Sequence, residues 1–414
     1  VAALVWPFAI LVMTVFLIPL EFFTTFGGAT LNRFMVLCLV AGWAASYVRT
    51  KQALHLRVPV GVMFAWIAWG ALSRLWSTGR LWASLVPALL LAWVFFLVVA
   101  DMVNTPRRLG WVLGALLAGM AVYIIIWFVT GSLFKDTFYL PSIGTGGLSM
   151  YGSLAGAIAA CLLAIILHIR SPWRETAIVF ALLVGYLLFS IGLRRSFLTT
   201  AAVLSAFLIF PRVARARGLV LTLAVLFLLY LAWSYMLPNL PEGVQERLTL
   251  EDVIETRATG RLDIWPLALN LWSKAPFTGV GLGDFGVYSR LSATVAYSPL
   301  SVHNMYLQVL VELGVVGFGL WIWGWANLVL SAARAYQASR TDSDRLLAAV
   351  PLALIVFFAA ATLVDPFDTW RLMWLAFGLT IGAERVICGK AGAEDIVSPS
   401  QRLSRLSPRS QRCE

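Results

Sequence analysis

The chain has 414 residues, of which 60% are hydrophobic and only 12% are charged. A water-soluble core of this length needs far less apolar sequence, so the composition excludes a soluble domain and indicates an integral membrane protein. The net charge of +11 follows from where lysine and arginine fall along the chain, and it does not indicate a nucleic-acid partner.

The apolar runs are long, do not alternate with polar residues and are rich in Leu, Ala and Val. They therefore predict transmembrane helices and exclude a membrane barrel. Charged breaks divide the runs into about twelve spans. In chain order we expect spans at 3–20, 31–48, 58–73, 82–100, 109–129, 151–169, 176–193, 196–211, 218–237, 305–332, 347–364 and 372–388. The predicted fold class is an all-α polytopic membrane protein with one long loop between the ninth and tenth spans.

The connections between these spans differ in charge. Most lysines and arginines collect on the side that also holds both ends of the chain, so we expect both termini to be cytoplasmic. The first apolar run lacks a small-residue cleavage signature and is expected to be a retained helix. We predict one transmembrane domain over 1–388. The Ser-, Arg- and Pro-rich tail over 389–414 is expected to be disordered at the anionic inner leaflet.

The long loop at 238–301 falls on the outer side and has helical features of its own. Thr249 to Asp252 predict the cap of a short helix that runs through Ile254. From Arg261 onward, apolar residues at helical spacing predict a helix in the membrane interface, with Trp265 and Trp272 at headgroup depth. Such helices would frame a site at the membrane surface.

The same loop carries the sequence Gly281-Leu282-Gly283-Asp284-Phe285-Gly286, which formally matches a dinucleotide-binding pattern. No predicted strand precedes it and no convincing helix follows it, so a nucleotide site is not indicated. We expect a tight turn in which the glycines adopt positive φ. Backbone amides that contact an anion are the alternative role.

Cysteine and histidine are sparse. The four cysteines fall in apolar runs or in the tail, and the three histidines lie in separate segments. This spacing predicts neither a disulfide framework nor a metal site.

His303 stands where the long loop returns to the membrane, in the run Ser301 to Gln308. A neutral imidazole accepts a proton near pH 7, so this position suits a general base. A capping or interfacial histidine is the alternative. Glu312 and Asp365 are candidates to orient the ring, although Asp365 is also explained by helix capping.

Three arginines complete the candidate site. Arg194 and Arg195 separate the seventh and eighth spans with almost no polar loop, where an anion would offset the cost of placing them near hydrocarbon. Their alternative role is interfacial snorkelling. Arg261 opens the predicted interfacial helix, and its alternative is a loop charge paired with Asp263. Arginine can bind phosphate through two parallel hydrogen bonds.

An ordered set of motifs resembles the O-antigen ligase and Wzy-type polymerase superfamily. The motifs are Thr259-Gly260-Arg261, Trp265, Pro276 to Gly283, His303 to Gln308, and Glu312 to Gly317. The twelve-span layout extends the resemblance over most of the chain.

The resemblance implies a glycosyltransferase of the GT-C type in the inner membrane of a Gram-negative cell, with no metal or cofactor and an active site facing the periplasm. It would transfer a glycan from undecaprenyl diphosphate to a sugar hydroxyl of lipid A–core, in lipopolysaccharide biosynthesis. The essential histidine of the family maps to His303, and its diphosphate-binding arginines map to Arg261 and to Arg195 or Arg194. Family members commonly have Ser-Arg where this chain has Arg194-Arg195-Ser196, so both arginines stay candidates.

We hypothesise a direct displacement that inverts the anomeric centre, in which His303 deprotonates the acceptor while Arg261 and the 194/195 pair stabilise the departing diphosphate. This mechanism requires the three groups to share one pocket at the outer face. Candidates for supporting roles are Asn304, Tyr306, Gly281 and Asp365.

Three alternatives stay open. A Wzy-type polymerase for O-antigen or exopolysaccharide would add repeat units to a growing chain, although polymerases typically have two sizeable outer loops. A protein O-oligosaccharyltransferase would use the same donor. A transporter or flippase for a lipid-linked anion would line its path with intramembrane arginines, but matching broken helices in two halves are not evident. The sequence does not specify the sugar, the linkage or the oligomeric state.

Overall fold

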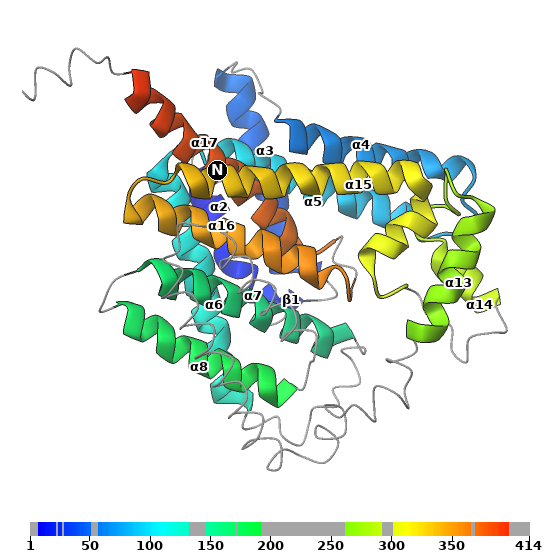
Figure 1. The fold of residues 1–414 in the computed structure, drawn as a ribbon, viewed down its shortest axis with the longest axis horizontal. Helices are drawn as coiled ribbons and strands as arrows, with labels where there is room; N and C mark the ends of the chain where they lie inside the picture. The colour runs from blue at the N-terminus through cyan, green and yellow to red at the C-terminus, as the bar shows by residue number, and fades with distance from the viewer. Residues whose placement is uncertain are drawn as a thin grey trace, which may run out of the picture.

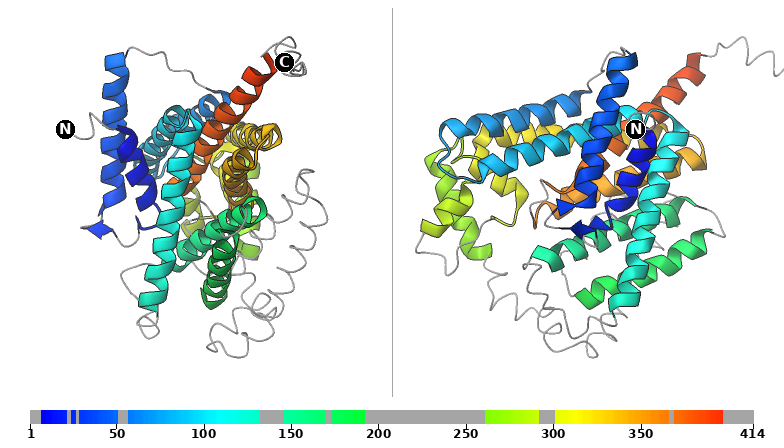
Figure 2. Two further views of the ribbon diagram at one scale, coloured as in Figure 1. Left: turned by 90° about the vertical axis from the view of Figure 1, so that its left-hand side faces the viewer. Right: turned by 180° about the vertical axis from the view of Figure 1, so that it is seen from behind.

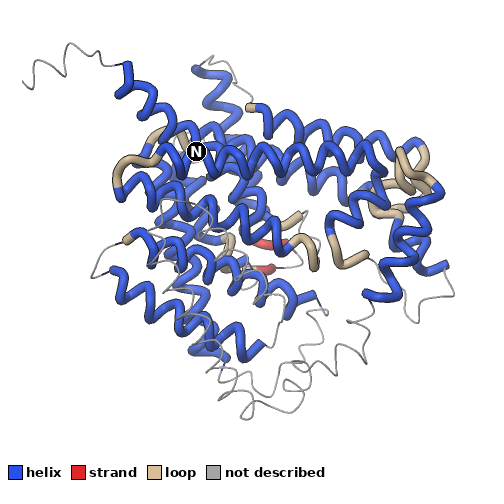
Figure 3. Tube along the Cα trace, in the orientation of Figure 1, coloured by secondary structure: helices blue, strands red, loops and turns tan. Residues whose placement is uncertain are grey.

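The computed structural model describes residues 7–21, 24–26, 29–50, 57–131, 146–169, 173–191, 261–291, 301–365 and 369–396. These residues are almost entirely helical (Figure 1, Figure 3). The exception is a pair of two-residue antiparallel strands, β1 (Thr25–Phe26) and β2 (Ala29–Thr30). The all-α prediction missed this hairpin because its strands are too short to show an alternating pattern.

Each expected span that falls within the described residues contains a helix. In chain order these helices are α2 (Pro7–Leu17), α3 (Leu31–Thr50), α4 (Val58–Leu72), α5 (Trp82–Met102), α6 (Pro106–Gly131), α7 (Gly146–His168), α8 (Trp173–Ile191), α15 (Met305–Ala338), α16 (Asp342–Ala361) and α17 (Arg371–Ile396). The short 3-10 helix η2 (Ser73–Leu75) follows α4. The spans expected at 196–211 and 218–237 lie outside the described residues.

Seven of the described helices are long and apolar enough to cross a membrane, namely α3, α4, α5, α6, α15, α16 and α17. The chain is therefore an integral, polytopic membrane protein. α17 continues through Ile396, so the first residues of the predicted tail extend the last helix.

α17 is the central helix of the bundle and packs against α5, α15 and α16. Its close contact with α5 depends on small residues, since Gly378 faces Val99 and Gly382 faces Val103. Aromatic rings fill the space beside this contact, with Phe377 against Phe96, Trp325 and Trp374. Over the most apolar stretch of α17, 83% of the residues are buried inside the bundle. This burial agrees with the apolar residues on all sides of the helix.

The remaining helices surround this centre. α2 and α3 pack together on one flank, and α7 and α8 pack together on another (Figure 2). Two helices of the long loop, α13 (Arg261–Lys274) and α14 (Phe285–Leu291), stand beside the first turns of α15 at one end of the bundle (Figure 1). The candidate site lies at that end.

Candidate active site

His303 sits at the start of α15 with an unusual backbone conformation. Its φ is 54°, in the left-handed region that residues other than glycine seldom adopt. Its backbone N–H donates to Ser301 Oγ at 3.1 Å, and that hydroxyl donates to Gln308 Oε1 at 2.9 Å. Asn304 is the N-cap of α15 and accepts from Leu307 N at 3.0 Å. A conformation that costs about 1–3 kcal/mol is thus held by neighbouring polar contacts, as is common at functional sites.

The imidazole of His303 faces a carboxylate on another helix end. His303 Nδ1 lies 3.3 Å from Asp365 Oδ1. The His303 side chain is 42% exposed, whereas that of Asp365 is 9% exposed. Met305 N donates to Thr362 O at 2.8 Å and fixes the start of α15 against the turn after α16. With the proton on Nδ1 donated to Asp365, Nε2 becomes the acceptor nitrogen.

Arg261 reaches the same turn from α13. Its guanidinium donates to the carbonyl of Val364, the residue before Asp365, at 3.1 Å. Four residues later, Trp265 Nε1 donates to the carbonyl of Val302, the residue before His303, at 3.2 Å. α13 therefore contacts both sides of the His303–Asp365 pair. We call His303, Asp365 and Arg261 the histidine site.

The predicted helix from Arg261 is confirmed, and its apolar face packs on protein. Ile264, Ala268 and Leu271 are buried with residues of α14 and α15 in a small core separate from the main one. The indole N–H of Trp272 donates to Pro276 O at 3.2 Å. This second core fixes α13, and with it Arg261, relative to His303.

The residues from 275 to 284, here called the glycine loop, form the predicted tight turn. Gly279, Gly281 and Gly283 all have positive φ. Val280 N donates to Val311 O at 3.0 Å, and Gly281 N donates to Glu312 O at 2.9 Å, so the loop lies along α15. One expectation was wrong: α14 begins at Phe285 directly after the loop and includes Gly286.

The glycine loop fits against a kink in α15. Gly314 has φ 65° and ψ −169°, which interrupts the helix. The next residue, Val315, donates its N–H to Pro276 O at 2.8 Å, and Trp69 Nε1 donates to Leu313 O at 2.9 Å. The backbone groups released by the kink are thereby hydrogen-bonded again.

Two buried carboxylates hold the glycine loop. Glu312 Oε2 accepts from Gly283 N at 2.9 Å, so this side chain holds the loop, whereas the sequence made it a candidate to orient His303. Asp284 is fully buried and accepts from Ser77 Oγ, Thr78 N and Gly79 N at 3.0, 2.7 and 2.9 Å. Sequence reasoning gave Asp284 no role, because its partners lie more than 200 positions away.

The other supporting candidates have structural contacts. Tyr306 Oη donates to Ala359 O at 3.0 Å and fastens α15 to α16. Gly281 forms the turn described above. Another pair missed from the sequence joins Arg371, at the start of α17, to Glu21, which also accepts from Thr30 at 2.8 Å.

Some predicted features fall outside the described residues, namely Arg194, Arg195 and the short helix from Thr249. Within the part of the chain that the structure describes, His, Cys, Asp and Glu do not form a group of three or more that could hold a metal ion.

The fold and the site define an integral membrane protein with a histidine–carboxylate pair beside an arginine. A family model described as O-antigen ligase matches residues 179–322. This match covers α13, the glycine loop, His303 and the kink of α15, and it confirms the resemblance to the O-antigen ligase and Wzy-type polymerase superfamily. Members of the family are enzymes that act on lipid-linked glycans. Among curated proteins, none matches the chain.

Proposed function

We propose that this protein is an O-antigen ligase, which transfers a glycan from undecaprenyl diphosphate to a sugar hydroxyl of lipid A–core. One observation carries the proposal: His303, 3.3 Å from Asp365, and Arg261, bonded to the adjacent Val364, converge on one turn. The family match at 179–322 supports the donor class, because family members act on lipid-linked glycans.

In the proposed reaction, Nε2 of His303 removes the proton from the acceptor hydroxyl. The hydroxyl oxygen attacks the anomeric carbon while the bond from that carbon to the diphosphate oxygen breaks. The electron pair of that bond leaves with the diphosphate, and the anomeric configuration inverts. Asp365 stabilises the imidazolium that forms and keeps the ring in its tautomer.

The diphosphate is a good leaving group once its charge is balanced, and arginine supplies a fixed cation with forked donors. The hydrogen bond from Arg261 to Val364 holds this guanidinium beside the histidine site. Arg195 or Arg194 is proposed as the second cation. Neither ATP nor a metal ion is needed in this scheme.

The proposed location is the inner membrane, with both termini in the cytoplasm and the histidine site facing the periplasm. The charge distribution of the sequence supports this orientation.

The acceptor is tested directly by reconstitution. Purified protein in liposomes receives undecaprenyl diphosphate glycan together with lipid A–core, carrier-linked glycan or a protein acceptor, and mass spectrometry follows the product. We expect lipid A–core to gain the glycan. Transfer to the carrier-linked glycan would instead make the protein a polymerase, and transfer to the protein acceptor would make it an oligosaccharyltransferase.

A further inference from the structure

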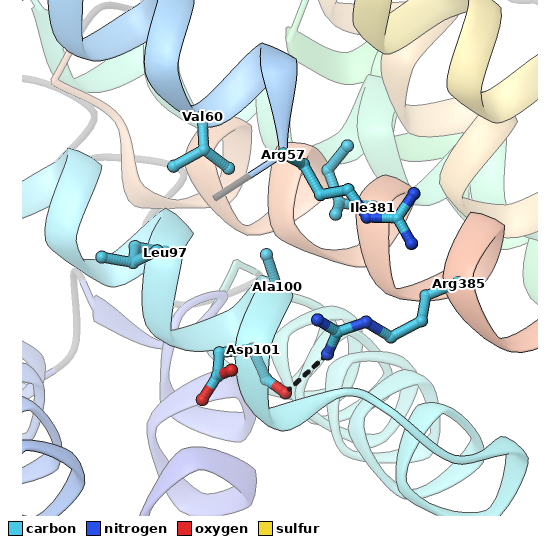
Figure 4. Close-up of a pocket in the computed structure, with 7 residues that line it drawn as sticks. All are labelled: Arg57, Val60, Leu97, Ala100, Asp101, Ile381 and Arg385. Atoms are coloured by element: carbon cyan, nitrogen blue, oxygen red, sulfur yellow. Dashed lines mark hydrogen bonds between the residues drawn. The ribbon is translucent and has the colours of Figure 1, made fainter. Parts of the chain in front are cut away.

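A second polar site lies at the other end of the bundle. Arg57, Val60, Leu97, Ala100, Asp101, Ile381 and Arg385 line a shallow, open cleft (Figure 4). It lies between the start of α4, the last turns of α5 and α17. Arg385 is fourteen residues along α17 from Arg371, which places it about 21 Å from the end where the histidine site lies. We call this second polar site the basic cleft.

The charges of the basic cleft are not balanced by its own residues. Asp101 turns its carboxylate toward α3, where it accepts from Trp43 Nε1 at 2.9 Å and from Tyr47 Oη at 3.4 Å. Arg385 donates to the backbone carbonyl of Asp101 at 3.2 Å, as the dashed line in Figure 4 shows. The guanidinium of Arg57 has no hydrogen bond or ion pair with any described residue. Two guanidinium groups therefore face one carboxylate that is already hydrogen-bonded.

Two other basic residues at this end of the bundle are paired with carboxylates. Arg334 lies 3.0 Å from Glu384, and Lys390 lies 3.0 Å from Asp344. The pairing of Glu384 with Arg334 is informative, because Glu384 is the chain neighbour of Arg385 and yet neutralises a different arginine. The two arginines of the basic cleft therefore differ from Arg334 and Lys390, because their charges are not neutralised by a carboxylate in the same way.

The rest of the cleft is apolar. Val60, Leu97, Ala100 and Ile381 line it beside the two arginines. A ligand that fits both parts carries an anionic group for the guanidinium groups and hydrocarbon for the aliphatic side chains. A net charge of about +1 in the cleft complements a phosphodiester, which carries one negative charge.

We propose that the basic cleft binds the phosphodiester headgroup of an anionic phospholipid. Basic pockets between transmembrane helices are suited to such headgroups, and the apolar lining favours a lipid over free phosphate. Bound lipid would join α4, α5 and α17 at the end of the bundle opposite the histidine site. This site is independent of the proposed transferase reaction.

The test compares three probes on the purified full-length protein in detergent, with binding followed by native mass spectrometry. The probes are short-chain phosphatidylglycerol, short-chain phosphatidylcholine and inorganic phosphate. We expect phosphatidylglycerol to bind most tightly. The variant Arg57→Gln/Arg385→Gln should bind it about 30-fold more weakly, since each arginine near an anionic lipid contributes roughly a factor of five.

The matched control is Arg107→Gln/Arg174→Gln, which removes two exposed arginines from the same end of the bundle. It should bind phosphatidylglycerol like the wild type. Arg57→Gln alone should fold normally, because the side chain of Arg57 makes no polar contact with described residues, and it should lose about fivefold in affinity. This single variant decides the question if the double variant does not fold.

Three results would overturn the proposal. Binding of phosphatidylcholine by the wild type as tightly as phosphatidylglycerol would indicate a general lipid contact. Unchanged phosphatidylglycerol binding by Arg57→Gln and by the double variant would remove the arginines from the site. Inorganic phosphate that binds as tightly as the lipid would identify a free-ion site.

Discussion

The glycine loop and the histidine site lie beside the same first turns of α15, but they are held in different ways. The glycine loop is held by hydrogen bonds between its backbone amides and α15 and by the buried carboxylates of Glu312 and Asp284. In the histidine site, the side chain of His303 is 42% exposed, and its Nδ1 lies 3.3 Å from Asp365 Oδ1. The glycine loop, His303 and Arg261 fall within the matched family segment, whereas Asp365 lies beyond it. Residues of one family motif set can therefore either build the scaffold or remain accessible for chemistry.

The largest expected effect is on protein stability and concerns the kink of α15, which belongs to the scaffold. A Cβ on Gly314 would lie 2.2 Å from Phe277 O, and the φ of 65° is unfavourable for alanine. Gly314→Ala should therefore cost about 2–6 kcal/mol and deplete folded protein. The matched control is Gly319→Ala in the same helix, where a Cβ meets no atom within 4 Å. Thermal unfolding in detergent compares the two, and equal stability would mean that the kink does not hold the glycine loop.

A smaller effect, confined to activity, is expected at Arg261. Arg261→Ala should weaken transfer, and Arg261→Lys should not restore it, because an ammonium group cannot form the two-pronged phosphate contact. Initial rates at varied donor concentration, with melting temperatures as the control, check this prediction. Equal rates for lysine and arginine would reduce the role of Arg261 to charge alone.

The smallest expected effect is at Asp365, which we propose as a positioning residue. Asp365→Asn should slow transfer about 10- to 100-fold. The lost negative charge disfavours the protonated imidazole, so the acidic limb of the pH–rate profile should move to lower pH. A merely structural role would lower the rate at every pH and leave the shape of the profile unchanged.

The sequence predicted the helices well because long apolar runs with charged breaks leave few alternatives. It also predicted the helix from Arg261 and the turn of the glycine loop. It did not predict the partner of Glu312 or the role of Asp284, since both depend on contacts between distant segments. The pairing of Arg371 with Glu21 was missed for the same reason. The β1–β2 hairpin was missed because its strands are too short to show an alternating pattern.

The most direct measurement of the central claim is glycan transfer by His303→Asn. Asparagine tolerates the left-handed backbone at this position but cannot act as a base at neutral pH. The account predicts that transfer to lipid A–core falls about 100- to 10,000-fold while binding of the lipid-linked donor and the melting temperature stay near those of the wild type. Transfer at the wild-type rate by this variant would contradict the assignment of His303 as the base.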